Sequence, residues 1–235
     1  MGETVVTTAA GDGSRDDPAG RRDGRAGRAA RTRAAVVDAL LTLNDRGHLR
    51  PTARDIAEEA GVSLRSLYVH FDDLEALFVA AAQRQAERLA AALPPLVAEG
   101  TLPERLDAFL ARRTRTHEVG AGVRKAAVLQ APFSPAVKQA VTTGRKLLRS
   151  EVARCFAPEI DAAGDDGARL LRALDVVASP STWDALRDHH GLTVDEATAD
   201  VRAMVLAFLA TWAPHAHDPP GPATTATRPP ASTAD

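Results

Sequence analysis

The sequence predicts an all-α protein in which a small three-helix unit precedes a larger helical domain. Three observations support this prediction. Apolar residues recur at helical spacing over most of the chain, no stretch alternates in the manner of a β-strand, and Ser or Thr repeatedly stands where a helix would begin. With 45% hydrophobic and 26% charged residues among 235, the chain has the composition of a globular protein with a sizeable core.

Two helices are expected first. An apolar run from Val36 to Leu43 lies in a helix that ends at Gly47. The stretch "TARDIAEEAG" then begins at Thr52, whose spacing to Asp55 matches a capping box, and it ends at Gly61.

The third helix, "LRSLYVHF", follows Ser63 as its cap and has four apolar positions: Leu64, Leu67, Val69 and Phe71. Gly61 can adopt the positive φ of a tight corner, and Ile56 and Val62 can wedge the second and third helices together. Eight residues give about 12 Å of helix, which fits the width of a major groove. The pattern is that of a helix-turn-helix.

The later helices start in similar ways. Asp72 and Asp73 place negative charge before a helix over 74–93, which Pro94 and Pro95 end. Further starts carry a Ser or Thr cap: Thr101 with Glu104, Ser134 before Pro135, Ser179 before Pro180, and Thr193 with Glu196. The helix from Ser134 is expected to run towards Phe156 and to stop at Pro158.

These elements divide the chain into four segments. Residues 1–26 and 215–235 are rich in Gly, Thr, Pro and Ala without periodicity, and we expect both to be disordered tails. Residues 27–73 form the helix-turn-helix unit, and residues 74–214 form the larger helical domain.

Composition excludes several classes of protein. Cys155 is the only cysteine, which excludes an internal disulfide and a Cys-based zinc site and suits a reducing cytoplasm. We expect no metal and no cofactor. The longest apolar stretch, residues 203–213, is shorter than a membrane span, and the N-terminus lacks the features of a secretory signal. Gly-rich phosphate loops, His-Glu-x-x-His and nucleophile elbows are absent, so an enzyme is not expected.

The charge is distributed unevenly. The whole chain has a net charge of −2, but residues 21–70 hold ten arginines and six acidic residues. A local charge of +4 before an acidic remainder predicts a nucleic-acid contact near the N-terminus.

We expect different residues of the helix-turn-helix unit to make different kinds of contact with DNA. Hydroxyls and an imidazole position the phosphate backbone in this interpretation: Thr52, Ser63, Tyr68 and His70. Arg65 and Ser66, on the first exposed turn of the third helix, would meet base edges, with Leu64 beside them. The upstream arginines, including Arg28 and Arg31, would supply attraction that does not depend on sequence.

The stretch "TARDIAEEAGVSLRSLYVHFDDLEALF" (52–78) resembles the DNA-binding signature of TetR-type transcriptional regulators. The resemblance rests on Ala60-Gly61-Val62-Ser63, Leu67-Tyr68, His70-Phe71, and Glu75 with Leu77, and it extends loosely over about 25–214. One position departs from the pattern: Leu74 stands where the family usually has a lysine that often touches phosphate. The contact at this position is therefore in doubt.

The resemblance implies a homodimer that binds a palindromic DNA operator and has a small-molecule pocket in its C-terminal domain. The last two helices of such proteins usually pair across the dimer, which makes the apolar stripe of the final helix a candidate interface: Val201, Met204, Val205, Phe208 and Trp212. In a monomer the same stripe would be core. His117, Arg124 and Trp183 are candidate ligand contacts, although exposure or capping would also explain each of them.

The function that follows is a ligand-responsive repressor that a small-molecule effector releases from DNA. Repression is adopted as the family's commonest mode, with activation as an alternative. A helical interaction module with a degenerate DNA-binding head is the second alternative.

Overall fold

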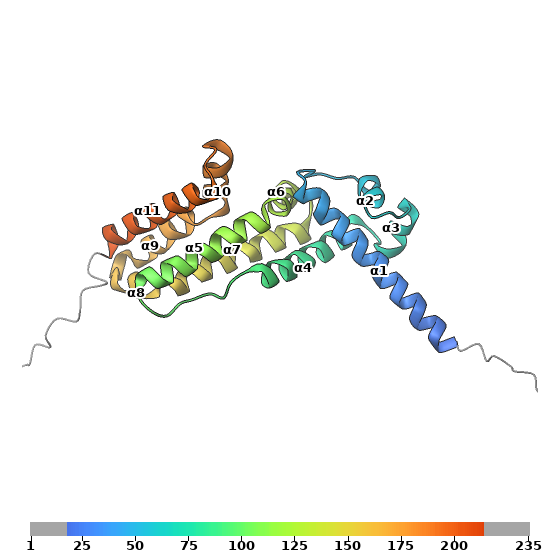
Figure 1. Cartoon of the computed structure of the whole chain (residues 1–235), viewed down its shortest axis with the longest axis horizontal. Coiled ribbons are helices and arrows are strands. Elements are labelled where there is room, and N and C mark those ends of the chain that lie inside the picture. Colours follow the sequence, from blue (N-terminus) through green and yellow to red (C-terminus); the bar gives the residue numbers. More distant parts are fainter. Residues whose placement is uncertain (1–17, 214–235) are drawn as a thin grey trace, which may run out of the picture. The chain divides into compact units, whose positions relative to one another are not determined.

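The computed structural model describes residues 18–213, and side chains from residue 26 onward. These residues form helices and no strand (Figure 1), which confirms the all-α prediction. The helices are α1 (Pro18–Asp45), α2 (Ala53–Glu59), α3 (Leu64–His70), α4 (Leu74–Ala92), α5 (Leu102–Val119), α6 (Ala121–Gln130), α7 (Pro135–Cys155), α8 (Ala157–Ala162), α9 (Gly167–Val177), α10 (Pro180–Asp184) and α11 (Val194–Trp212). Two 3-10 turns, Ala131–Phe133 and Gly164–Asp166, and a π-helical turn, Ala185–His189, complete them.

The chain divides into two compact units. The first ends at Arg84 and the second begins at Gln85, so the division falls within α4 rather than after residue 73. Helix α1 begins at Pro18, and residues 18–26 are therefore helical where the sequence predicted a tail. The remainder of the predicted tails, residues 1–17 and 214–235, lies outside the described part of the chain, as do His215 and His217.

The first unit is built on the middle of α1, which packs against α2 and α3. Its buried residues come from every helix of the unit: Val36, Leu40 and Leu41 from α1, Ile56 and Ala57 from α2, Leu67 and Phe71 from α3 and its cap, and Leu77 from α4. The guanidinium of Arg33 lies 4.6 Å from the centre of the Phe71 ring, a cation–π contact between α1 and the end of α3. The unit therefore has its own core.

The second unit is a bundle in which α9 lies against both α7 and α11, and α5 against both α7 and α11 (Figure 1). Its apolar core includes Phe109 of α5, Phe156 after α7, Leu174 of α9 and Val205 of α11. The rings of Phe109 and Phe156 meet edge to face, with centroids 5.1 Å apart. Within residues 18–213, no helix is long and apolar enough to cross a membrane.

The predicted caps are confirmed. Thr52, Thr101 and Thr193 form capping boxes with the acidic residue three positions later. Ser63, Ser134 and Ser179 accept hydrogen bonds from backbone N–H groups three residues ahead. The box hydrogen bonds from the threonine backbone and hydroxyl lower the pKa of the three carboxyls, those of Asp55, Glu104 and Glu196.

Helix α7 ends at Cys155 with Phe156 as its C-cap, as predicted, and Pro158 then stands in the first turn of a new helix, α8, where a missing N–H costs nothing. Of the four apolar positions predicted in the third helix, Leu67 and Phe71 are buried, whereas Val69 and Leu64 are 71% and 40% exposed. Val69 is exposed because positions four apart share a face and position 69 faces away from both 67 and 71.

Candidate nucleic-acid interface

The corner between α2 and α3 depends on Gly61. Its φ is +66°, the left-handed region that L side chains rarely adopt. Backbone bonds from Gly61 N to Glu58 O (3.1 Å) and from Val62 N to Ala57 O (2.9 Å) close the turn. A Cβ at this position would meet nothing within 4 Å, so the backbone conformation rather than space favours glycine.

Helix α3 is held by one face and presents the other to solvent. Leu67 is fully buried beneath it, whereas Leu64, Arg65, Tyr68 and Val69 are exposed. Arg65 and Tyr68 stand one turn apart on the same face, as a helix lying in a groove requires. The structure therefore brings these two predicted contacts together on an exposed surface.

Ser66 and His70 are less accessible than the sequence predicted. Both are half-buried, and the backbone N–H of Ser66 donates to Ser63 Oγ at 3.0 Å. Ser63 is exposed, and because its oxygen accepts this bond, its hydroxyl proton remains to be donated elsewhere. Ser63 thus keeps the chemistry expected of a phosphate contact.

Thr52 is differently placed. It is exposed, but its hydroxyl donates to Asp55 Oδ2 at 2.8 Å, and its backbone N–H donates to the same oxygen. The nearby carboxylate would oppose a phosphate, and the hydroxyl proton is already used. A phosphate contact from Thr52 would require this hydrogen bond to break.

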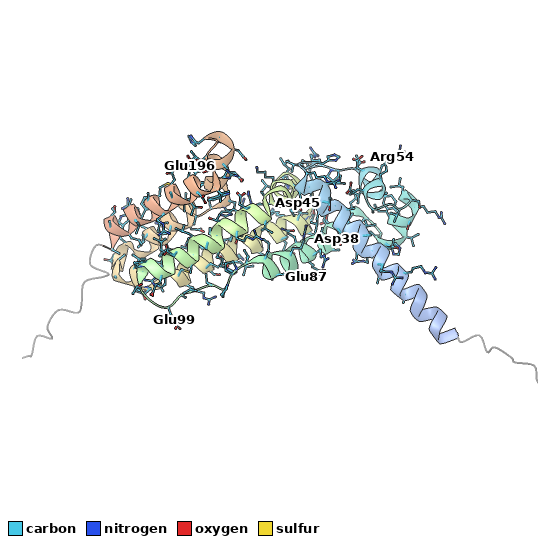
Figure 2. The ribbon with its side chains drawn as sticks, in the orientation of Figure 1. Asp38, Asp45, Arg54, Glu87, Glu99 and Glu196 are labelled. Atoms are coloured by element: carbon cyan, nitrogen blue, oxygen red, sulfur yellow. The ribbon has the colours of Figure 1, made fainter. Side chains whose placement is uncertain are left out.

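Two exposed residues were not predicted from the sequence as DNA contacts. Arg54 projects from α2 (Figure 2), between the two members of the capping box. Val69 is the most exposed large apolar residue of α3 and could contact a thymine methyl group. The signal for Arg54 was its place in "TARD", since the first turn of a helix near DNA is a common position for a phosphate contact.

The start of α4 explains what Leu74 does. Leu74 is half-buried at the first residue of the helix, and Asp73 Oδ1 accepts from the N–H of Ala76 at 2.8 Å. A carboxylate therefore caps this helix, with exposed Asp72 beside it. Two negative charges and an apolar residue disfavour a phosphate contact at this helix terminus.

The predicted arm lies on α1. Arg28 and Arg31 are exposed on this helix, and Arg33 is held over Phe71. Further along, Arg46 pairs with Glu59 at 2.9 Å and Arg84 with Asp38 at 3.1 Å. Arg28 and Arg31 thus remain suited to the sequence-independent attraction that we expected of them.

Two of the three candidate ligand residues, His117 and Trp183, border one cavity in the second unit, and Arg124 does not border it. His117 of α5 and Trp183 of α10 are buried, with ring centroids 5.7 Å apart. Arg124 of α6 forms two hydrogen bonds to the carboxylate of Asp184, at 2.6 and 2.8 Å. His117 and Trp183 are buried rather than exposed, and both border a cavity with Arg113.

Electrostatics keep His117 neutral. Burial, followed by the charge of Arg113 one turn earlier, lowers the pKa of His117 to about 3. Burial also lowers the pKa of Arg113, against the opposing effect of Glu151. No group of three or more His, Cys, Asp or Glu residues within 18–213 is arranged to hold a metal ion.

The apolar stripe of α11 divides between core and surface. Val201 and Val205 are buried in the second unit itself, and Met204, Phe208 and Trp212 are half-buried against the same core. Phe208 and Trp212 stack with centroids 5.3 Å apart. Leu206 is 42% exposed on the opposite side of the helix, among exposed Ala203, Ala207 and Ala210.

Comparison with known proteins agrees with this geometry. Residues 38–81 match the family model described as bacterial regulatory proteins, tetR family, and this match spans α2, α3 and the flanking parts of α1 and α4. No curated protein matched the chain. The crystal structure of a transcriptional regulator from Rhodococcus sp. Rha1 superposes with a TM-score of 0.59 over 78% of this chain and 96% of that one. The TM-score shows a shared fold, and at 17% sequence identity the likeness extends to the fold alone. Residues 38–81 therefore match the DNA-binding domain of the tetR family, within a chain that has the fold of the Rhodococcus transcriptional regulator.

Proposed function

We propose that this regulator is a repressor that binds a palindromic operator as a homodimer and is released by a small-molecule effector. The observation that carries the DNA-binding part is α3 itself, a capped helix that buries Leu67 and exposes Arg65, Tyr68 and Val69. A short helix with one anchored face and one exposed face is what the major groove accepts. From a role at DNA we also infer that the protein acts in the cytoplasm.

The contacts divide into two classes. Arg65 would read a base edge, most simply guanine, with Val69 and Leu64 offering apolar contact. Ser63, Tyr68, His70 and Arg54 would position the phosphate backbone, and Arg28 and Arg31 would add attraction that does not depend on sequence. Thr52 can contact the phosphate backbone only if the hydrogen bond from its hydroxyl to Asp55 breaks.

A homodimer would supply the second recognition helix. Two copies of α3 must lie about 34–36 Å apart to enter successive major grooves of a palindrome. The exposed face of α11 around Leu206 is the best-supported contact on this helix, because Val201 and Val205 are occupied by the core of their own unit. Met204, Phe208 and Trp212 could contribute from the half-buried edge.

The effector site would be the cavity next to His117 and Trp183. An effector that favours a different separation of the two recognition helices lowers the affinity for DNA, and by linkage DNA lowers the affinity for the effector. The enclosed cavity, with both polar and apolar residues in its walls, supports this part of the proposal.

Selection from random DNA duplexes tests the proposed function. We expect a palindromic site whose binding survives competitor DNA, with log K falling steeply against log salt concentration. Sedimentation of the complex should show two protein chains for each site. If no sequence is enriched, the chain is instead a helical interaction module with a degenerate DNA-binding head, an alternative that the acidic start of α4 favours. A reporter gene placed behind the selected site then separates repression from activation.

A further inference from the structure

Two hollows of the second unit share one wall. The inner one is a cavity of about 10 Å³ between α5, α9, α10 and α11, bordered by Arg113, His117 and Ala178. The outer one is an open cleft of about 220 Å³ beside the π-helical turn, bordered by Glu118, Lys125 and Arg187. Among the described residues, Trp183 alone borders both hollows. Its indole therefore separates an enclosed space from one that solvent can enter.

Two residues that border the inner cavity each have a buried polar atom without a hydrogen-bond partner in the described part of the chain. His117 Nε2 lies 3.2 Å from the carbonyl oxygen of Ala178, and because a carbonyl only accepts, this nitrogen carries the proton. A neutral imidazole with its proton on Nε2 leaves Nδ1 as an acceptor. His117 Nδ1 and Arg113 Nε are buried, and neither has a hydrogen-bond partner among the residues that the structure describes.

The chemistry of these two atoms selects the ligand. A hydroxyl group both donates and accepts, so it offers the donor that His117 Nδ1 lacks and the acceptor that Arg113 Nε lacks among the described residues. A carboxylate cannot donate to Nδ1, and protonating His117 to receive it is opposed by burial and by Arg113. A cationic ligand would be repelled by the positive charge of the Arg113 guanidinium. The other walls, which include Leu110, Val177 and Val201, are apolar.

A direct hydrogen bond holds Trp183 in place. Its Nε1–H donates to Glu118 Oε1 at 2.8 Å, and Arg187 Nε approaches the same oxygen at 3.4 Å. Glu118 is the chain neighbour of His117 on α5, and Trp183 is followed by Asp184, which Arg124 anchors. The cavity holds roughly one water as it stands, so a larger ligand requires the indole to move towards the cleft.

We propose that the effector of this regulator is a small uncharged molecule with a hydroxyl on an apolar body, bound between His117 and Arg113, and that Trp183 is the gate through which it enters from the outer cleft. The proposal deepens the effector site of the proposed function and rests on it. Opening the gate breaks the bond to Glu118 and shifts the junction at which α10 passes directly into the π-helical segment, an irregular part of the helix.

Phenol and two matched analogues test the ligand class. Trp183 and Trp212 are the chain's only tryptophans, so a Trp212→Phe background makes Trp183 the sole indole. Titration of this full-length protein at pH 7.5 should give a saturable fluorescence change with phenol. Anisole, which cannot donate, and benzoate, which cannot donate and carries a charge, should bind at least about tenfold more weakly. Equal binding of phenol and anisole would overturn the hydroxyl assignment, and no saturable response to phenol would overturn the site.

His117→Phe removes the accepting nitrogen while keeping a ring in the same space. We expect this variant to lose the preference for phenol over anisole, and a preference that persists would contradict the proposal. If the variant does not fold, ¹⁵N spectra of the parent protein provide the same test. The Nδ1 resonance of His117 should move to lower frequency as phenol is added, because the nitrogen then accepts a hydrogen bond, and an unmoved resonance would exclude the contact.

Glu118→Ala and Glu118→Gln form a matched pair for the gate. Gln keeps an oxygen that can accept from the indole N–H, whereas Ala removes it. Stopped-flow fluorescence should show phenol entering the Ala variant about tenfold faster than the Gln variant, since the Ala variant has no acceptor to hold the indole. Equal entry rates would show that Glu118 does not hold the gate.

The proposed DNA-binding function and the proposed ligand can each be disproved without the other. All of these titrations use protein without DNA, so selective phenol binding would stand even if no operator were found. A selected operator together with indifference to phenol would leave the DNA-binding role intact and remove only the assignment of the ligand.

Discussion

The hydroxyl oxygen of Ser63 accepts the backbone N–H of Ser66 at 3.0 Å, which caps α3 and directs Arg65, one of the two residues between them, into solvent. This local bond decides which side chains of the helix are available for a groove. Ser66 itself is half-buried, so we expect base reading to fall mainly on Arg65.

Arg65→Ala should therefore relax specificity at one base pair of each half-site and cost roughly 1–3 kcal/mol of binding free energy per half-site. The measurement is affinity for the selected operator and for single-base variants of it. Arg54→Ala serves as the control, because removing a phosphate-binding side chain should weaken all sequences together. An unchanged base preference in the Arg65 variant would refute the base-reading role.

Tyr68→Phe should weaken binding to all sequences about equally, by about 0.5–1.5 kcal/mol, since the hydroxyl is assigned to the phosphate backbone. The exposed ring stays in place, so the fold should not change. Binding isotherms over several salt concentrations provide the test. A change in sequence preference would instead place the Tyr68 hydroxyl against a base edge.

Gly61→Ala should destabilise the protein by roughly 1–2 kcal/mol, because φ of +66° is strained for any residue with a Cβ. Gly144→Ala is a matched control. Gly144 lies inside α7, and an added Cβ would likewise meet nothing within 4 Å. This second variant should gain about 0.5–1 kcal/mol, because Ala loses less conformational freedom in a helix. Denaturant unfolding measures the free energy of unfolding of both variants. If Gly61→Ala and Gly144→Ala changed it in the same direction, the assignment of strain to Gly61 would be contradicted.

Stability should fall as the pH drops from 7.5 to 5.5 because of His117. Its pKa is about 3 in the folded protein and 6.5 in an unfolded chain, so over this interval only the unfolded state takes up the proton. The stabilisation is complete above pH 6.5 and is lost progressively as the pH approaches 3. By pH 5.5 the loss should be about 1.4 kcal/mol. In the His117→Phe variant this component of the pH dependence should disappear, and an unchanged pH dependence would show that other groups cause it.

Substitutions at two neighbouring residues of α11, Leu206 and Val205, distinguish a dimer contact from a core position. Leu206→Glu places a charge on the exposed face and should raise the monomer fraction in sedimentation while leaving the unfolding free energy nearly unchanged. Val205→Ala removes buried methyl groups and should cost roughly 1–3 kcal/mol of stability. A Leu206→Glu protein that remains dimeric would move the proposed interface away from this face.

Local signals predicted much of this protein. Ser63, Thr101 and Thr193 mark helix starts because a side-chain oxygen reaches an N–H only three residues away, a relationship that the sequence contains in full. Gly61 marks the corner for the same reason, since its φ is a property of one residue. The helical class, the helix-turn-helix and the exposed position of Arg65 were therefore open to prediction.

Contacts between distant segments were decided by the tertiary structure alone. His117 and Trp183 are 66 positions apart in numbering, and the packing of α5 against the later helices encloses them in one cavity. The same packing buries Val205 in the core and leaves Leu206 exposed at the surface, although both residues belong to one apolar stretch of α11. Local patterns record where a helix begins and which residues are apolar, whereas burial and charge neighbours depend on which helices meet. The sequence by itself thus determined the DNA-binding scaffold, and the tertiary structure determined the chemistry of the cavity.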